Sequence, residues 1–211
     1  MKEEIVFVLL PGFADWEGAP LAAELAQPET EHPAFEVRYA SLSREPIRSI
    51  GGLTVLPDLA LHEIPVDAKA LVLVGGTSWK TPEAEAVAPV VRQFLEAGKV
   101  VGAICDAAHF LGAQGLLNQH RHTANMKQVL EGEAGYQNPE GFVPEDAVRQ
   151  EPSHRQRPGP LPLCPGDAPG PGSFRGSGAV LVRFPDPGSK SSPGQILPGG
   201  LIEGVKDIGK E

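Results

Sequence analysis

The chain has 211 residues, which is long enough for a domain with a sizeable hydrophobic core. Its net charge of -9 comes without a basic stripe, so nucleic acid is not expected as a partner. No apolar run approaches the roughly 20 residues that span a bilayer, so no membrane partner is expected either. The N-terminus leads directly into a short apolar run without a cleavage site, which predicts a cytoplasmic protein without an export signal.

The first part of the chain alternates apolar runs with one helical pattern. The expected elements are a buried strand at 5–10 that ends at Pro11-Gly12, a helix at 16–26, a strand at 35–40, and a strand or hairpin arm at 50–56 with Gly51-Gly52 as its turn. Pro20 falls inside the helical pattern, and it is tolerable only near the start of a helix.

The same alternation continues to about residue 125. The expected elements are a strand at 70–74 that ends at Gly75-Gly76, a helix capped by Thr81 and closed by Gly98, a strand at 100–104, a helix at 107–114, and a short strand at 121–125. Pro82 suits the first position of the capped helix.

Strands that alternate with helices and short Gly-rich turns predict an α/β fold. We expect a doubly wound parallel sheet covered on both faces, as in a flavodoxin-like three-layer sandwich. Active sites of such sheets lie at the carboxyl ends of the strands. Three turns carry unusual residues there, at 11–17, 75–79 and 104–107.

The composition changes near residue 151. Eleven of the 22 prolines fall in residues 151–211, where only 179–184 resembles a strand. Such a stretch buries too little apolar surface to offset the entropy of ordering it. We therefore divide the chain into an α/β domain at 1–150 and an irregular Pro/Gly-rich tail, disordered or loosely packed, at 151–211.

Cys105 follows a buried strand directly and is followed by small residues. This pattern is typical of a nucleophile elbow, a sharp strand-to-helix turn that projects its side chain from the sheet. The helix N-terminus favours a thiolate and is expected to lower the pKa of the cysteine. Backbone N–H groups of the elbow and of Gly75-Gly76 are placed to form an oxyanion hole. The alternative is that Cys105 is only a small buried hydrophobic residue.

No metal site or disulfide is expected. Cys105 and Cys164 lie in very different contexts and do not suggest a disulfide framework. His120 and His122 lack companion ligands at metal-binding spacing, so we place them in a solvated turn near a strand.

Five segments together resemble the ThiJ/PfpI superfamily, the group of the parkinsonism-associated deglycase within the class I glutamine amidotransferase-like fold. They are LPGFADWE at 10–17, VGGTSW at 74–79, AICDAAHFLG at 103–112, GLL at 115–117 and HTAN at 122–125. The resemblance extends from residue 4 to about residue 150.

The resemblance implies a role for each matching residue. Cys105 corresponds to the elbow cysteine, and Glu17 to the acid that hydrogen-bonds it and keeps it a readily oxidised thiolate. Gly75, Gly76 and the amide of Asp106 correspond to the oxyanion hole. Without the resemblance, Glu17 is simply an exposed residue in the first turn of a helix.

The sequence also departs from this family. Protease-like members carry a histidine directly after the cysteine, where this chain has Asp106; this removes the simplest general base and weakens the case for peptidase activity. Asp106 is either an alternative acid or base or, as we favour, a helix cap. Other members carry a histidine at the position of Asn125. His109 and His122 lie nearby in sequence, and with Trp79 and Asn125 they complete the set of accessory candidates.

These features predict a cysteine-dependent enzyme of the hydrolase or lyase type, acting without a cofactor on a small carbonyl, amide or glycated substrate. The alternative is a non-enzymatic oxidative-stress sensor or chaperone that uses oxidation of Cys105. Because family members are commonly dimers, the resemblance also implies a homodimer.

The family pattern stops near Gln150. Residues 151–171 can be back-translated into DNA with freely chosen codons. When this DNA is read one base out of frame, it can encode a strand, a turn and an amphipathic helix. A frameshift near codon 150 is therefore a hypothesis for the tail.

Overall fold

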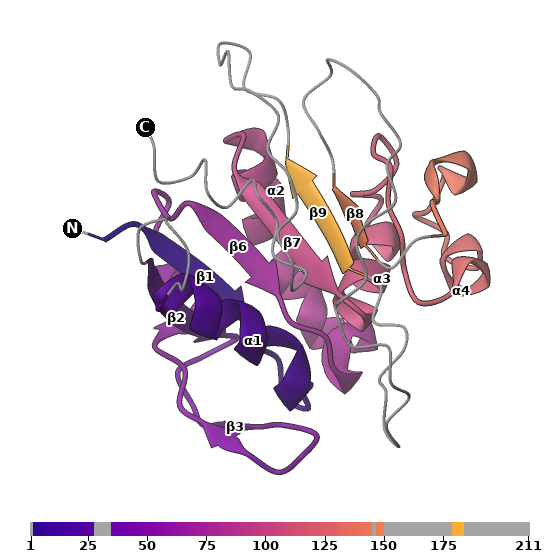
Figure 1. The fold of residues 1–211 in the computed structure, drawn as a ribbon. Coiled ribbons are helices and arrows are strands. Elements are labelled where there is room, and N and C mark those ends of the chain that lie inside the picture. Colours follow the sequence, from indigo (N-terminus) through magenta and orange to yellow (C-terminus); the bar gives the residue numbers. More distant parts are fainter. Residues whose placement is uncertain (1, 28–34, 145–146, 150–178, 184–211) are drawn as a thin grey trace, which may run out of the picture.

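The computed structural model describes residues 2–27, 35–144, 147–149 and 179–183. A seven-stranded sheet forms the centre, in the order β5-β2-β1-β6-β7-β9-β8 (Figure 1). Its strands are β1 (Glu4–Val8), β2 (Glu36–Ser41), β5 (Leu59–Ala60), β6 (Ala70–Leu73), β7 (Val100–Ile104), β8 (Ala147–Arg149) and β9 (Ala179–Arg183). A hairpin outside this sheet pairs β3 (Ile47–Arg48) with β4 (Thr54–Val55).

The described residues include four α-helices between the strands: α1 (Asp15–Ala26), α2 (Val87–Glu96), α3 (Asp106–Ala113) and α4 (Lys127–Glu131). Short 3₁₀ helices occupy Leu61–Glu63, Thr77–Lys80, Pro82–Ala86 and Pro139–Gly141. No helix in the described ranges is both long enough and apolar enough to cross a membrane.

The central strand β1 explains the layered architecture. It pairs in parallel with β2 on one side and with β6 on the other. Its residues alternate between the two faces, so Val6 and Val8 pack in the cluster that α2 and α3 cover. Ile5 and Phe7 pack instead in the cluster beneath α1. Both clusters are buried, and this two-sided burial is the reason that the strand reads as a continuous apolar run.

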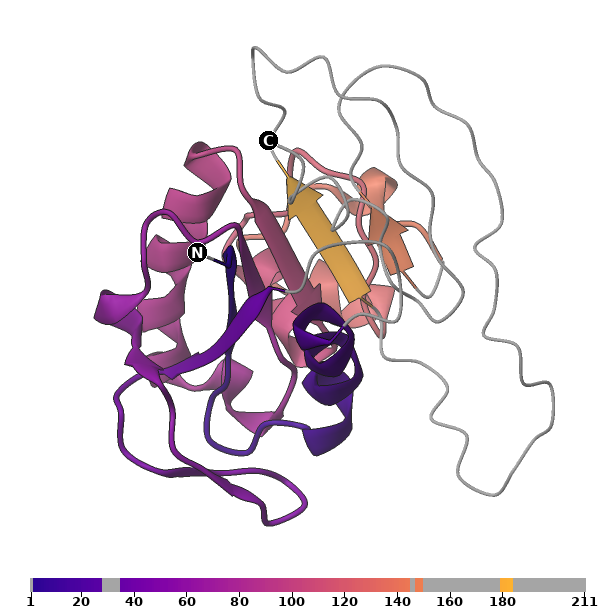
Figure 2. The same cartoon turned by 60° about the vertical axis from the view of Figure 1, so that its left-hand side comes forward.

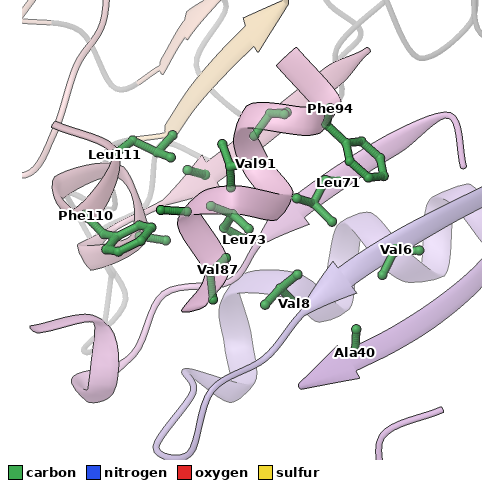
Figure 3. Close-up of a cluster of buried hydrophobic side chains, with 14 of the residues drawn as sticks. Val6, Val8, Ala40, Leu71, Leu73, Val87, Val91, Phe94, Phe110 and Leu111 are labelled. Carbon is green, nitrogen blue, oxygen red and sulfur yellow. The ribbon is translucent and has the colours of Figure 1, made fainter. Parts of the chain in front are cut away.

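The helices confirm the doubly wound arrangement. Figures 1 and 2 show α1 on one face of the sheet and α2 and α3 on the other. Figure 3 shows the cluster on the α2 and α3 face, where Val87, Val91 and Phe110 meet side chains of the central strands. The three-layer α/β fold predicted from the sequence is therefore confirmed.

Some local predictions were wrong. Residues 121–125 form no strand of the sheet; His122 makes an isolated bridge to Phe142. Thr81 holds the expected cap position, but its side chain makes no capping bond, because its hydroxyl donates to the carbonyl of Ser78 at 3.0 Å. The five residues that follow Thr81 form a 3₁₀ helix rather than an α-helix. Pro20 lies inside α1 rather than in its first turn, at an exposed position of the helix.

The sheet is also not entirely parallel, because β9 pairs antiparallel with β7. The predicted strand at 179–184 thus lies beside the strand that leads into Cys105, and it connects β7 to β8. The rest of the predicted tail, with Cys164 and the segment of the frameshift hypothesis, lies outside the described residues.

Candidate active site

Cys105 lies on the turn between β7 and α3, as its sequence context predicts. Its φ of 56° and ψ of -125° lie in a region that side-chain-bearing residues rarely adopt. Within the described ranges it is the one non-glycine residue with positive φ. Such a conformation costs on the order of 1–3 kcal/mol and persists only where the surrounding structure enforces it. This geometry is that of a nucleophile elbow, and it leaves the side chain partly exposed.

The electrostatic surroundings of the thiol differ from expectation. Burial raises the pKa of Cys105, and the negative charges of Glu17 and Asp106 raise it further. A hydrogen bond from Asn125 and another from the backbone N–H of Asp106 lower the pKa, but they do not reverse the shift. The prediction of a lowered pKa was therefore wrong, because burial outweighs the hydrogen bonds from Asn125 and from the Asp106 N–H.

Asn125 is the accessory candidate that contacts the sulfur. Its side-chain Nδ2 donates to Sγ of Cys105 at 3.1 Å. The loop that carries Asn125 is anchored three residues earlier, where the His122 N–H donates to the Gly141 carbonyl at 2.9 Å. The His122 carbonyl in turn accepts from the N–H of Val143 at 2.8 Å. The chain therefore supplies a neutral amide donor where other family members were expected to supply an imidazole.

Glu17 approaches the same point from the first turn of α1. A Cβ placed on Gly75 would lie 2.2 Å from Oε2 of Glu17 and 2.7 Å from Cβ of Cys105. The carboxylate and the cysteine thus flank one glycine that has no room for a side chain. Because Glu17 also raises the pKa of Cys105 through its charge, the two groups interact electrostatically as well as by proximity.

The loop with the predicted oxyanion glycines is fixed by the loop after β1. Phe13 and Gly76 form an antiparallel bridge. In this bridge the N–H of Ala14 donates to the Gly75 carbonyl at 2.9 Å, and the N–H of Thr77 donates to the Gly12 carbonyl at 3.0 Å. Neither bond uses the N–H of Gly75 or Gly76, so the bridge positions these amides without consuming them.

Asp106 is the first residue of α3, while Cys105 occupies the N-cap position without a side-chain cap bond. The expectation that Asp106 caps the helix was therefore wrong. Its carboxylate instead adds a negative charge to the first turn, where the helix dipole favours it. Its backbone N–H faces the sulfur and contributes to the cysteine environment.

The histidines are engaged elsewhere. His109 is buried on α3, with Nε2 3.5 Å from a carboxylate oxygen of Glu133. His122 is completely buried; its Nδ1 lies 2.8 Å from the His120 carbonyl and its Nε2 2.6 Å from the Tyr136 hydroxyl. The prediction of a solvated turn for His120 and His122 was wrong, because both side chains pack inside the domain. In the described part of the chain, no three His, Cys, Asp or Glu residues gather as a metal site.

Trp79 belongs to the core rather than to the exposed site. Its side chain is buried, and its indole Nε1 donates to the carbonyl of Val74 at 2.7 Å. Its ring packs against Phe110 of α3 with centroids 5.1 Å apart. Trp79 therefore fixes the end of the strand that leads to Gly75 and links it to the helix behind Cys105.

Two features of the site escaped sequence reasoning. The first is the hydrogen bond that Asn125 donates to Cys105. In the sequence, Asn125 stands out only because other family members have a histidine at its position. The hairpin of β3 and β4 reaches the loop before Glu17, where the Ile50 N–H donates to the Phe13 carbonyl at 2.9 Å. Its Gly51-Gly52 turn signals a hairpin, but a local pattern contains no information about what the hairpin touches.

Comparison with known sequences and structures shows which family the chain resembles. The sequence model of the DJ-1/PfpI family matches residues 3–148. A Bacillus subtilis relative named uncharacterized protease YdeA is 34% identical over 148 residues, which are 70% of this chain and 72% of the relative. A Thermococcus kodakarensis relative named deglycase TK1284 is 34% identical over 96 residues, 43% of this chain and 56% of the relative. The solved DJ-1 superfamily protein Atu0886 of Agrobacterium tumefaciens superposes with a TM-score of 0.65 at 31% identity, covering 71% of this chain and 78% of that one.

Proposed function

Because the chain belongs to the DJ-1/PfpI family, we propose that it is a cysteine-dependent enzyme in which Cys105 adds to the carbonyl carbon of a small substrate. Aldehydes, ketones and glycated groups are the favoured substrates. The observation that carries this proposal is the setting of Cys105, a strained elbow cysteine whose sulfur accepts a hydrogen bond from Asn125 while Glu17 lies beside the adjoining glycine.

The first step follows from these positions. As the sulfur of Cys105 forms a bond to the carbonyl carbon, the thiol proton passes to the carboxylate of Glu17. The π electrons of the carbonyl move to its oxygen, which the amides of Gly75 and Gly76 stabilise. Return of the proton from Glu17 to that oxygen gives a neutral thiohemiacetal. A raised pKa makes this coupled proton transfer necessary, because the thiol is largely protonated at neutral pH.

Carbonyl addition suits this site better than amide hydrolysis. Cleavage of an amide requires a proton for the leaving nitrogen and a base that activates water, and imidazole commonly serves both purposes. His109 and His122 are buried with partners of their own, and Asn125 cannot accept and return a proton at neutral pH. The name of the Thermococcus relative fits carbonyl chemistry, and that of the Bacillus relative fits the amide alternative.

The test compares turnover of methylglyoxal with turnover of a chromogenic peptide amide. We expect consumption of methylglyoxal that disappears in Cys105→Ser and falls strongly in Glu17→Gln, with little or no amide cleavage. Amide turnover that exceeds methylglyoxal turnover would contradict the substrate preference. If neither compound is consumed while peroxide oxidises Cys105 to the sulfinate, the protein is a sensor of oxidation rather than an enzyme.

A further inference from the structure

The carboxylate of Asp15 ties the β3–β4 hairpin to the start of α1. The Ser49 hydroxyl donates to Oδ1 of Asp15 at 2.5 Å, and the Gly51 N–H donates to Oδ2 at 2.9 Å. The Ser49 hydroxyl oxygen also accepts from the N–H of Leu53 at 2.9 Å. One side chain, two residues before Glu17, thus binds both the residue before the turn and a residue within it.

The backbone of the hairpin continues this connection into the loop after β1. The N–H of Gly12 donates to the Arg48 carbonyl at 2.7 Å, and the N–H of Ile50 donates to the Phe13 carbonyl at 2.9 Å. The same loop is bridged on its other side to Gly76. A continuous series of hydrogen bonds therefore runs from the hairpin through the loop at 12–14 to the glycines beside Cys105.

Apart from one apolar side chain on each strand, the hairpin is held mainly by these hydrogen bonds. Each of its strands has two residues, and an isolated two-stranded hairpin is marginally stable at best. Ile50 and Leu53 near its turn are 50% and 56% exposed, so they contribute little packing. In Figure 1 the hairpin projects beyond the sheet near the start of α1. Its anchoring therefore depends on Ile47 and Val55, which pack on the cluster beneath α1, and on the bonds to Asp15 and to the loop after β1.

We propose that Asp15 is a positioning residue, which fixes the amides of Gly75 and Gly76 for the developing oxyanion by holding the hairpin against the loop at 12–14. This inference rests on the proposed function for its kinetic consequence. The ionised side chain is required, because a carboxylate has two acceptor oxygens for the two donors of the turn. An aspartate is ionised at neutral pH, and the bonds from Ser49 and Gly51 lower the pKa of Asp15 further below its ordinary value.

The first test measures amide hydrogen exchange of Gly12, Ala14 and Thr77, whose N–H groups form the connecting bonds. We expect faster exchange of all three in Asp15→Ala and a smaller increase in Asp15→Asn, which keeps one acceptor. The matched control is Asp58→Ala, because Asp58 also accepts a backbone bond, from the N–H of Tyr39 at 2.8 Å, but belongs to another part of the sheet. Unchanged exchange in the Asp15 variants would overturn the inference whether or not the protein is an enzyme.

The second test measures methylglyoxal turnover and alkylation of Cys105 by iodoacetamide in the same variants. Loss of positioned oxyanion donors should lower kcat by about 10- to 100-fold with KM changed little. Alkylation develops no oxyanion, so its rate should stay within about twofold, since the thiol pKa is unaltered. A fall in both rates would mean that Asp15 supports the cysteine itself and would overturn the assigned role.

If Asp15→Ala does not fold, Ser49→Ala removes one of the two donors and provides the same comparison. Absence of turnover in the wild type would refute the proposed function. The exchange measurement would then decide by itself whether Asp15 fixes the loop.

Discussion

The side-chain amide of Asn125 donates a hydrogen bond to the sulfur of Cys105 at 3.1 Å, across an interval of twenty residues. This bond favours the thiolate, and it opposes the effects of burial and of the neighbouring carboxylates. The thiol pKa therefore depends on burial, which raises it most, on two N–H donors that lower it and on two acidic side chains that raise it. The side-chain contributions of Asn125 and Glu17 can be removed separately.

Asn125→Ala should slow alkylation of Cys105 at pH 7–8. Loss of the amide donor raises the thiol pKa further, and the thiolate fraction falls about tenfold for every increase of about 1 in that pKa. The measurement is the rate of iodoacetamide labelling against pH, with the modified peptide identified by mass spectrometry. Met126→Ala is the matched control, because Met126 is the adjacent residue and is 59% exposed. A faster reaction of Asn125→Ala would show that the amide shields the sulfur instead of activating it.

Glu17→Gln should change alkylation and turnover in opposite directions. Removing the charge lowers the pKa of Cys105, so labelling at pH 7 should accelerate by about two- to tenfold. Turnover of methylglyoxal should fall, because no carboxylate receives the thiol proton. Glu24→Gln on the same helix is the control. Parallel losses of both rates, together with a large drop in Tm, would mean that Glu17 is structural.

Gly75→Ala should abolish activity and destabilise the fold. The added Cβ would lie 2.2 Å from Oε2 of Glu17 and 2.9 Å from the Ile104 carbonyl, so backbone must move. Such overpacking costs about 1–3 kcal/mol, measurable by urea unfolding. In Gly132→Ala the added Cβ would lie 3.5 Å from the Val129 carbonyl, an ordinary contact, and this control should stay within about 0.5 kcal/mol of the wild type. Equal stability of the two variants would contradict the crowding described for Gly75.

Acid should destabilise the protein through its buried histidines. Burial lowers the pKa of His120 and of His122 below the ordinary value of 6.5, so the unfolded chain takes up protons first as the pH falls. The free energy of unfolding should therefore be level with respect to these groups above about pH 7 and decline below pH 6.5, by up to about 1.4 kcal/mol per pH unit for each histidine.

Urea unfolding at a series of pH values between 5 and 8 tests this dependence. His122→Gln should reduce the slope below pH 6.5, although it also removes the bond to Tyr136 and lowers stability overall. His62→Gln, at an exposed position, should leave the slope unchanged. An unaltered slope in His122→Gln would show that the acid sensitivity arises from other groups.

The local sequence was sufficient to predict those strands and turns whose structure depends on neighbouring residues. Continuous apolar runs and glycine turns predicted the parallel strands β1, β6 and β7, and the small residues around Cys105 predicted the sharp turn into α3. These features are local, because burial of both strand faces and a tight turn each restrict residue types over a few positions. Glu17 is indicated only by the family resemblance, because no local pattern distinguishes it.

What surrounds the sulfur depends instead on the packing of distant segments. The thiol pKa depends on burial and on charges from separate elements of the fold. The helix N-terminus considered by itself therefore predicted a lowered pKa, whereas the pKa of Cys105 is raised. His109 and His122 are nearer to Cys105 in sequence than Asn125 is, yet packing buries both and leaves Asn125 at the sulfur. The connection from Asp15 to Gly75 likewise requires three loops to meet. Desolvation and hydrogen bonding depend on which groups meet in space, and that information is absent from any single stretch of sequence.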